Sequence, residues 1–410
     1  MTAAPAPRRA LPRLREPGAH LGPLPVINLV VLEVGLALGL VLLAVDTALW
    51  GAALLVALVT VPLALGRWHG RWMVRWIQLT GHYLMRARGI SLPAGNSGSG
   101  DPRAALLTAL IPDLTVAPGA DRHREPLGFV WRQGTWTAVL EVDATSSMIA
   151  PIGDAAGTTG LPLGALASCL EDRGVVLDAI QVIWHCYPGN AALPSSSPAL
   201  RSYLEVLGPL PAAARRTTWI AVRLDPRRCP EAVAERGGDV TGCHRALIAA
   251  LSRVRATLES KGVAARPLDT DQLLRAGICA AELSGITGAA GSAQPVTVSE
   301  GWTTVTAAGV GHTSYAITSW GTTGAAPNLN ALTGVRALST TVALVISPGE
   351  GGNEVGLRGL VRVSARNPAE LEAADGQLRA AAQQLGVGLR PLAGLQAAGL
   401  AATLPLGSSG

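Results

Sequence analysis

The chain has 410 residues, 49% of them hydrophobic and 15% charged, with a formal net charge of +5. This modest charge gives no separate footprint for binding nucleic acid. Lys261 is the only lysine and stands in no Gly-x-x-x-x-Gly-Lys-Ser/Thr motif, which excludes a P-loop nucleotide hydrolase. The five cysteines form no Cys-x-x-Cys pair, which indicates free thiols in a reducing compartment.

Two long apolar runs dominate the beginning of the chain, at residues 24–45 and 48–66, after a tail over residues 1–23. Each run has about the ~20 residues that a helix needs to cross a bilayer. Only Asp46 and Thr47 separate the two runs, so they predict a tight transmembrane hairpin. The alternative is a hairpin buried in a soluble core, but two adjacent runs of this length exceed what such cores use.

Arginines flank the predicted hairpin on both sides, whereas its turn carries Asp46 and no cation. Positive charge stays on the cytoplasmic side of a membrane. We therefore expect a multi-pass protein of the cell (inner) membrane with both termini in the cytoplasm. Cleavage as a signal peptide is not expected, because a second span follows the first directly.

Glu33 lies near the middle of the first span, where an acid costs about 2.5 kcal/mol or more on insertion scales. The second span offers no cation, so we hypothesise that Glu33 faces another protein chain; a lone acid tolerated through bilayer thinning is the alternative. Gly35 and Gly39 form a small-xxx-small step that permits close helix approach. At ~100° per residue they point away from Glu33, so one face would hold the hairpin together and the other would meet a partner.

Arginine and tryptophan each recur every four residues after the second span, at Arg67, Arg71 and Arg75 and at Trp68, Trp72 and Trp76. This spacing predicts an amphipathic helix over residues 67–89 that leaves the membrane. The tryptophans suit the membrane interface and the arginines suit anionic lipid headgroups. A helix that binds a protein partner is the alternative. The candidate interface residues are Trp68, Arg71, Trp72, Arg75 and Trp76.

The rest of the chain predicts a mixed α/β domain over residues 127–405, after a linker over residues 90–126. Within the linker we expect a helix at 103–110 and a loop at 112–126. Apolar runs bounded by turn residues predict strands at 128–132, 135–143, 179–187, 217–224, 263–266, 296–307, 312–320, 340–347, 354–364 and 387–390. Helical periodicity predicts helices at 163–172, 200–207, 230–236, 242–261, 270–280, 329–338 and 368–385. Asn367 is the expected N-cap of the last of these, and a short apolar helix follows the final strand.

An internal similarity suggests two related halves within this domain. Residues 262–268 (GVAARPL) match residues 386–392 (GVGLRPL), and a long amphipathic helix precedes each copy. Before each helix comes a strand with a Val-Arg pair, ending at Asp225-Pro226 or Asn367-Pro368. The alternative is that these are helix-capping and turn residues found in any α/β unit, because caps of this kind recur widely.

Catalytic motifs are scarce. Asp269-Thr270-Asp271 resembles the Asp-x-Asp metal site of nucleotide-sugar transferases, although Asp and Thr are also ordinary residues of a helix start. Residues 236–242 (RGGDVTG) present glycines that either bind an anion at the next helix start or form a plain connection. His185-Cys186 at a strand end suggests a thiol site, but a buried cysteine beside a histidine is the favoured interpretation.

The ordered set of features resembles the EccE family, membrane components of actinobacterial type VII (ESX) secretion systems. The set comprises the hairpin with its Trp/Arg-rich exit, residues 216–226 (RTTWIAVRLDP), the glycine turn and the helix that ends before Arg266-Pro267-Leu268. The similarity runs from about Pro23 to Leu392, and no single motif is diagnostic. The turn departs from the family pattern at Asp239, where a third small residue is expected.

The resemblance implies a place in an inner-membrane core complex with EccB-, EccC- and EccD-like subunits, of which EccC-like subunits carry the ATPases. It further implies a peripheral subunit that stabilises the assembly, with no cofactor, no metal and no established catalysis. We therefore predict a non-catalytic structural subunit. One alternative is a membrane-tethered, glycosyltransferase-like enzyme that uses Asp269 and Asp271, and another is a regulator that binds an anion at residues 237–242.

Overall fold

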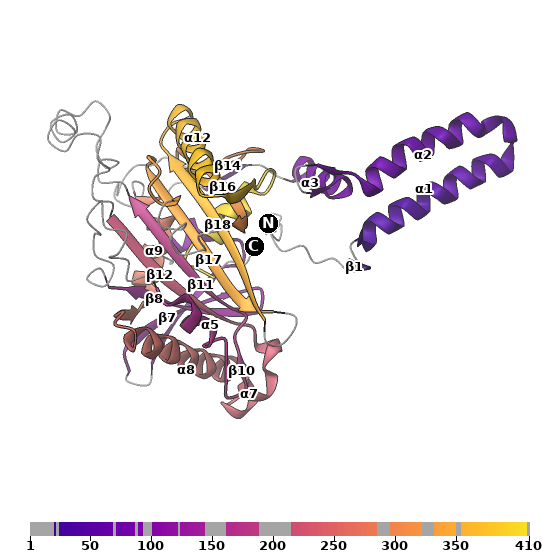
Figure 1. Cartoon of the computed structure of the whole chain (residues 1–410). Coiled ribbons are helices and arrows are strands. Elements are labelled where there is room, and N and C mark those ends of the chain that lie inside the picture. Colours follow the sequence, from indigo (N-terminus) through magenta and orange to yellow (C-terminus); the bar gives the residue numbers. More distant parts are fainter. Residues whose placement is uncertain are drawn as a thin grey trace, which may run out of the picture. The chain divides into compact units, whose positions relative to one another are not determined.

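The computed structural model describes residues 20–21, 24–68, 71–86, 89–92, 101–121, 124–143, 161–187, 215–284, 296–321, 332–349 and 354–407. The helix expected at 200–207 and the first part of the helix expected at 329–338 lie outside these residues. The chain forms two compact units, Arg13–Arg88 and the part from Gly89 onward. Figure 1 shows the elements of each unit.

The first unit is built on an antiparallel helical hairpin. Helices α1 (Val26–Val45) and α2 (Trp50–Leu65) fall within the two predicted apolar runs, which confirms two apolar helices. The turn between them is a short 3-10 helix, η1 (Thr47–Leu49), whose first turn is capped by the Asp46 carboxylate through the Ala48 N–H at 2.8 Å. Strands β1 (His20–Leu21) and β2 (Leu24–Pro25) pair just before α1.

The helix predicted over residues 67–89 is wrong at its start. Residues 67–72 form two short strands, β3 (Arg67–Trp68) and β4 (Arg71–Trp72), which pair antiparallel, and helix α3 begins only at Met73 and ends at Met85. Gly66 and Gly70 lie within five residues of each other, and glycine is a poor helix former. The four-residue repeat of Arg and Trp is therefore not a continuous helical stripe.

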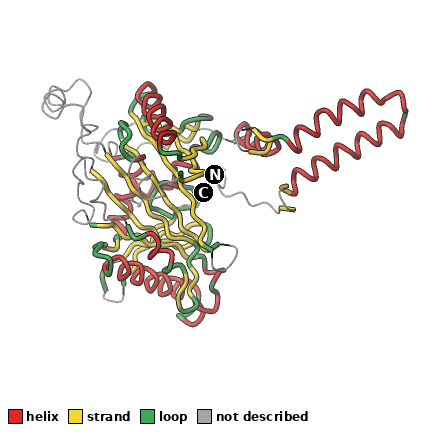
Figure 2. Tube along the Cα trace, in the orientation of Figure 1, coloured by secondary structure: helices red, strands yellow, loops and turns green. Residues whose placement is uncertain are grey.

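The second unit is an α/β/α sandwich around one sheet, in which 13 strands lie among the described residues and every described pair is antiparallel (Figure 2). The order across the sheet is β5-β14-β15-β16-β18-β17-β11-β12-β8-β7-β6, with β13 added to β8 and β19 added to β16. The strands span Gly89–Leu92 (β5), Thr115–Ala120 (β6), Pro126–Arg132 (β7), Thr135–Val142 (β8), Ala179–Tyr187 (β11), Arg215–Leu224 (β12), Ala265–Pro267 (β13), Val296–Glu300 (β14), Val305–Ala307 (β15), Val310–Trp320 (β16), Ser339–Pro348 (β17), Val355–Ala365 (β18) and Val387–Pro391 (β19).

Helices cover both faces of this sheet, and each face has its own apolar core. One face carries α5 (Leu163–Ala167), α8 (Asp239–Glu259) and α12 (Pro368–Gln384), with η2 (Pro226–Arg228) and α7 (Pro230–Glu235) leading into α8. The other carries α4 (Pro102–Leu110), α9 (Thr270–Ala280) and α13 (Gln396–Ala402). Burial on both faces explains why strands such as β11 are apolar at nearly every position.

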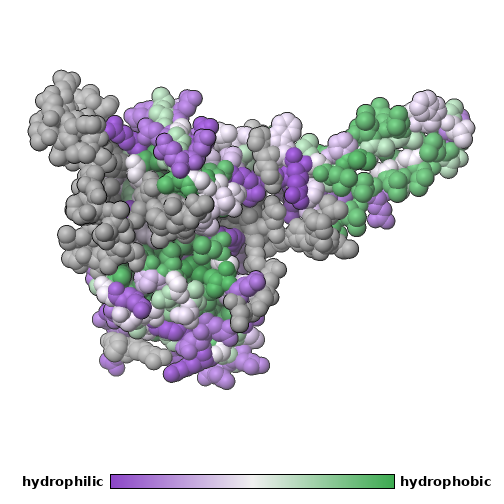
Figure 3. Space-filling view, in the orientation of Figure 1, coloured by the Kyte–Doolittle hydropathy of each residue, from purple (hydrophilic) through white to green (hydrophobic). Residues whose placement is uncertain are grey.

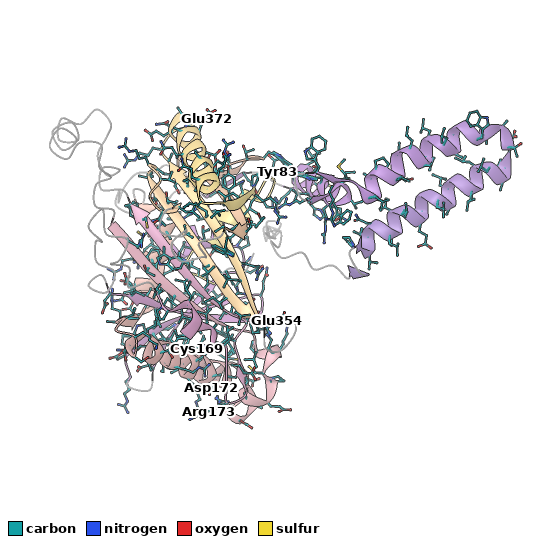
Figure 4. The ribbon with its side chains drawn as sticks, viewed as in Figure 1. Tyr83, Cys169, Asp172, Arg173, Glu354 and Glu372 are labelled. Carbon is teal, nitrogen blue, oxygen red and sulfur yellow. The ribbon has the colours of Figure 1, made fainter. Side chains whose placement is uncertain are left out.

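A small hairpin is attached to α8 on the first of these faces. Strands β9 (Glu171–Asp172) and β10 (Val175–Val176) turn at Arg173 and Gly174, both with positive φ, as tight two-residue turns require. Arg253 of α8 donates to Asp172 Oδ2 and to the carbonyl of Cys169, each at 2.7 Å. Figure 4 labels Cys169, Asp172 and Arg173 in this region. The predicted helix at 163–172 therefore ends early, because the chain turns into this hairpin.

Two further expectations need correction, and both concern hairpins. The loop expected at 112–126 is wrong, since β6 within it pairs with β7 along its whole length. The single strand expected at 296–307 is instead the hairpin of β14 and β15. By contrast, Asn367 caps α12 as predicted, accepting from the Glu370 N–H at 2.8 Å.

The sheet repeats one connection pattern in its two halves, as the internal similarity predicted. In chain order β8, β11, β12, α8 and β13 come first, and β16, β17, β18, α12 and β19 follow. In the first set β12 lies between β11 and β8, and β13 pairs with β8. In the second set β18 lies between β17 and β16, and β19 pairs with β16. The two sets meet where β11 pairs with β17. Ile180 and Val342 occupy corresponding positions in the two sets, as each pairs with the Val of a Val-Arg pair. Ile180 faces Ile346 and Trp184 faces Val342, so the register of this junction is symmetric.

Candidate functional site

The hairpin of the first unit is held by close contacts between its helices. A Cβ added to Gly35 would stand 2.5 Å from the Thr60 side chain, so only glycine permits this approach. Near the open end, Asn28 Nδ2 donates to the Ala64 carbonyl at 2.7 Å in a buried position. At Gly39 an added Cβ would lie 3.9 Å from the Ala53 carbonyl, an ordinary contact. Of the two predicted glycines, Gly35 therefore makes the tight contact.

Glu33 is exposed on the surface of α1, away from the buried Gly35. The structure thus places the acid and the close helix contact on different faces of α1, as the sequence predicted. Figure 3 shows that the surface of the hairpin is mostly apolar. What Glu33 contacts stays a prediction.

The arginines and tryptophans after the hairpin stack on one another. The Arg67 guanidinium lies 4.0 Å from the Trp72 ring centroid, and that of Arg71 lies 5.8 Å from Trp76. Trp76 Nε1 in turn donates to the Trp68 carbonyl at 2.9 Å. Because a cation over an aromatic face is attracted by the ring quadrupole, these contacts fold the segment back on itself. Arg75 lies on α3, where its side chain is half-buried.

Asp269 and Asp271 both have structural partners. Asp269 is the N-cap of α9 and forms a capping box, accepting from the Gln272 N–H at 2.7 Å. Asp271 pairs with Arg103 of α4 at 2.6 Å and with Arg275 one turn further along α9. Hydrogen bonding to Arg103 lowers the pKa of Asp271. The two carboxylates thus fix α9 and α4, and the comparison with a transferase metal site finds no support in this geometry.

The glycine turn at residues 236–242 is a tight connection between α7 and α8. Gly237, Gly238 and Asp239 all have positive φ, and a Cβ on Gly242 would stand 2.2 Å from the Val233 carbonyl. Arg245 Nη1 donates to the Arg236 carbonyl at 3.0 Å, which closes the turn. The glycines are needed for this backbone path and approach.

A buried polar cluster, which the sequence did not reveal, crosses the four central strands. On the face covered by α9 and α13, two rows of registered residues cross these strands. The first row is His185, Thr341, Arg362 and Ser314. The second row is Ser339, Ser364 and His312, and Tyr187 lies two residues beyond His185 on β11. The side chains of His185, Arg362 and His312 are fully buried. Glu282, just after α9, faces the first row with 8% of its side chain exposed.

The hydrogen bonds of the first row have one consistent direction. Arg362 Nη2 donates to Thr341 Oγ1 at 2.9 Å, and Thr341 Oγ1 lies 2.8 Å from His185 Nδ1. His185 Nε2 faces Glu282 Oε1 at 3.4 Å. A carboxylate accepts only, so Nε2 carries the imidazole proton and the Thr341 hydroxyl donates to Nδ1. Tyr187 donates to the other oxygen of Glu282 at 3.2 Å.

Burial shifts the pKa values in this cluster. Desolvation lowers the pKa of His185, although Glu282 opposes the shift, and lowers that of His312 further because the Arg362 charge adds to it. The pKa of Arg362 falls to about 10 for the same reason, so this arginine remains a buried cation at neutral pH. Arg362 also donates to the Ala280 carbonyl in the last turn of α9, where the helix dipole favours a positive charge.

The corresponding arginine of the first half is buried as well. Arg223, in the other Val-Arg pair of the repeat, donates to Asp178 Oδ2 at 2.5 Å. The internal similarity in the sequence therefore includes both arginines, but it did not indicate that they are buried. Gln181 and His185 of β11 are polar residues four positions apart in an otherwise apolar strand, so they lie on one face of it. Such a pair is the signal that points to a buried polar row. Cys186, the neighbour of His185, is buried, which confirms the favoured interpretation of that pair.

Comparisons with known proteins find a similarity over part of the chain. Residues 212–317 match the family model described as "Putative type VII ESX secretion system translocon, EccE". The ESX-5 secretion system protein EccE5 of Mycobacterium marinum is 28% identical over 203 residues, covering 45% of this chain and 47% of that protein. The ESX-1 secretion system protein EccE1 of Mycolicibacterium smegmatis is 40% identical over 80 residues, covering 20% of this chain and 17% of that protein.

The matched part spans less than half the length of these curated relatives. The family model covers β12, the glycine turn, α8 and α9. The first three of these carried part of the resemblance in the sequence, whereas the apolar hairpin lies outside this match. In this part the chain is therefore similar to EccE proteins of type VII (ESX) secretion systems.

Proposed function

We propose that this chain is a non-catalytic structural subunit of an inner-membrane type VII secretion complex, anchored by α1 and α2. The exposure of these two helices carries the proposal. Val26–Val45 and Thr47–Leu65 are long, apolar helical stretches, and only 11% of each is buried. A core helix of a soluble protein would be mostly buried, whereas a bilayer covers an apolar surface of this length.

In this proposal both termini and the α/β body lie in the cytoplasm. The arginines on both sides of the hairpin and the acidic turn at Asp46 support this orientation through the positive-inside rule. The body would then lie beside the cytoplasmic motor of the machinery, and EccB-, EccC- and EccD-like subunits are its expected neighbours.

Membrane extraction and native electrophoresis of the full-length protein test the proposal together. The protein should resist carbonate, dissolve in mild detergent and migrate in a megadalton complex. Protease added to intact spheroplasts should leave the body undigested. Release by carbonate alone, or digestion of the body from outside, would overturn the anchoring and its orientation; a free monomer would overturn the role in the complex.

Glu33 is the residue of α1 that we assign to a partner within the membrane. Replacing it with leucine removes an acid that lipid would not stabilise, so Glu33→Leu should insert normally but lose co-purifying subunits. Val34→Leu changes the next residue, which is 62% exposed, and serves as the matched control. Unchanged recovery of every subunit with Glu33→Leu would show that this acid makes no such contact.

A further inference from the structure

The buried cluster of the central strands contains side-chain atoms that the described residues leave unsatisfied. Nε and Nη1 of Arg362 form no hydrogen bond with any described residue, although Nη2 of the same guanidinium forms two. Nε2 of His312 and Oγ of Ser314 are likewise without a partner in the described part of the chain. All three side chains are fully buried. Buried polar atoms in native proteins are nearly always hydrogen-bonded, so exceptions point to a bound ion or water molecule.

These atoms belong to neighbouring positions on one face of the sheet. Ser314 of β16 is paired with Arg362 of β18, and His312 lies two residues from Ser314 on the same strand and therefore on the same face. Figure 1 shows β16 and β18 near the centre of the sheet, where they are adjacent. Burial, and after it the Arg362 charge, lowers the pKa of His312, which agrees with a short separation of the two groups.

Helices α9 and α13 close this place from solvent. Arg362 Nη2 donates to the Ala280 carbonyl at the end of α9. Gln396 Oε1, at the start of α13, accepts from the Ser314 N–H at 2.8 Å. A Cβ added to Gly399 of α13 would stand 2.6 Å from the Ser314 Cβ, so the backbone of this helix lies directly on β16. Any ligand of the unsatisfied atoms must therefore be small.

The unsatisfied atoms favour a ligand that accepts hydrogen bonds. A guanidinium has donors only, and the Ser314 hydroxyl is able to donate as well. Ser364 Oγ lies 2.9 Å from His312 Nδ1. When this serine hydroxyl donates to Nδ1, the proton of the neutral imidazole is on Nε2, which makes His312 a further donor.

The local charge favours an anion over a water molecule. Arg362 is a buried cation, and Glu282 is the acid whose charge acts on it. The carboxylate oxygens of Glu282 face His185 Nε2 at 3.4 Å and the Tyr187 hydroxyl at 3.2 Å instead. An anion accepts from all of the remaining donors, whereas a water molecule also needs acceptors for its own hydrogens. Because burial of each further charge is expensive, a monovalent ion suits the site better than phosphate or sulfate.

We propose that Arg362, Ser314 and His312 bind a small monovalent anion of the halide class, such as chloride. The anion accepts from Nε and Nη1 of Arg362, from the Ser314 hydroxyl and from His312 Nε2, and it joins β16 to β18 beneath α13. Because the unfolded chain has no such site, the bound anion stabilises the folded state. This inference is independent of the membrane anchoring proposed above.

Urea unfolding of the detergent-solubilised full-length protein tests the site, with chloride exchanged for gluconate at constant ionic strength and neutral pH. Above its dissociation constant, each tenfold rise in chloride should lower the equilibrium constant of unfolding about tenfold. Arg362→Lys removes the donors Nε and Nη1 and should abolish this dependence. Arg366→Lys changes an exposed arginine just after the same strand and should retain it in full.

Ser314→Ala covers the case in which Arg362→Lys does not fold. It removes one hydroxyl and should raise the chloride concentration for half of the effect about tenfold, the typical loss for one hydrogen bond to a charged group. Stability that does not depend on chloride in the unaltered protein would mean that water satisfies these atoms, and the proposal would be wrong. A dependence that persists unchanged in Arg362→Lys or in Ser314→Ala would assign the ion to another site and would equally overturn it.

Discussion

Arg362 is a cation in the centre of the sheet, at a position with no solvent access. Burying a charge is expensive unless an opposite charge and hydrogen bonds compensate it. Here Thr341 and the end of α9 accept hydrogen bonds from Nη2, and the nearby Glu282 supplies negative charge. Nε and Nη1 of Arg362 have no hydrogen-bond partner among the described residues, so the compensation is partial. Because Thr341 and Arg362 belong to the second half of the sheet and His185 and Glu282 to the first, the cluster ties the halves together through directional bonds.

Glu282→Gln is expected to destabilise the protein by about 2 kcal/mol, because it leaves the buried Arg362 without its nearby negative charge while preserving side-chain shape. Chemical denaturation of the detergent-solubilised protein, followed by far-ultraviolet circular dichroism, measures this loss. Glu259→Gln breaks an exposed pair with Arg255 and should change stability by less than about 0.5 kcal/mol. Equal effects of the two variants would argue against the compensating role of Glu282.

Residue-level prediction succeeded where the signal was local in sequence. Gly35 and the Asn367 cap follow from spacings of a few residues along one helix. The cluster around Arg362 did not follow, because its partners are separated by long stretches of chain, 156 residues between His185 and Thr341. A single sequence does not reveal which strands pair or in which register, and the register alone brings these side chains into a row.

At the scale of elements, the Arg and Trp repeat at residues 67–76 shows how a regular spacing misleads. A repeat of four residues favours a helix, yet glycines and stacking of arginine on tryptophan produced a folded-back strand pair instead. Strand β6 was missed for a related reason, since its Pro118 and Gly119 favour a loop. Pairing with β7 stabilises this strand despite its weak propensity.

The two glycines of α1 should respond differently to alanine. Gly35→Ala places a methyl group against Thr60 and should weaken the hairpin by about 1–3 kcal/mol, as overpacking typically does, whereas Gly39→Ala has room. Titrating SDS into protein held in mild detergent, with tryptophan fluorescence as the signal, compares the two variants. A Gly39 variant as unstable as the Gly35 variant would contradict the contact seen at Thr60.

At the scale of the molecule, stability should depend on pH through the buried histidines. His185 and His312 have pKa values lowered by burial, so the folded protein binds protons at these side chains less readily than the unfolded chain does. The unfolded chain takes up protons at these side chains below their ordinary pKa of about 6.5, and the free energy of unfolding should therefore decrease as pH falls below that value. Each histidine contributes at most about 1.4 kcal/mol per pH unit.

Denaturant melts of the full-length protein between pH 7.5 and 5 measure this slope. His312→Gln should reduce the slope of the free energy of unfolding against pH by the contribution of one proton, at most about 1.4 kcal/mol per pH unit. His82→Gln changes an exposed residue of α3 and should leave this slope unchanged. A slope that persists in full after His312→Gln would assign the proton uptake to other groups.

The junction between β11 and β17 has a consequence for the chain while it is being made. The first half leaves the ribosome with β11 as an unpaired apolar edge, and nothing can cover that edge until Ser339–Pro348 has been synthesised. An open edge of this kind invites pairing with other chains. The nascent protein therefore exposes this edge while more than 150 further residues are translated, and this is the interval in which we expect it to be most prone to aggregation.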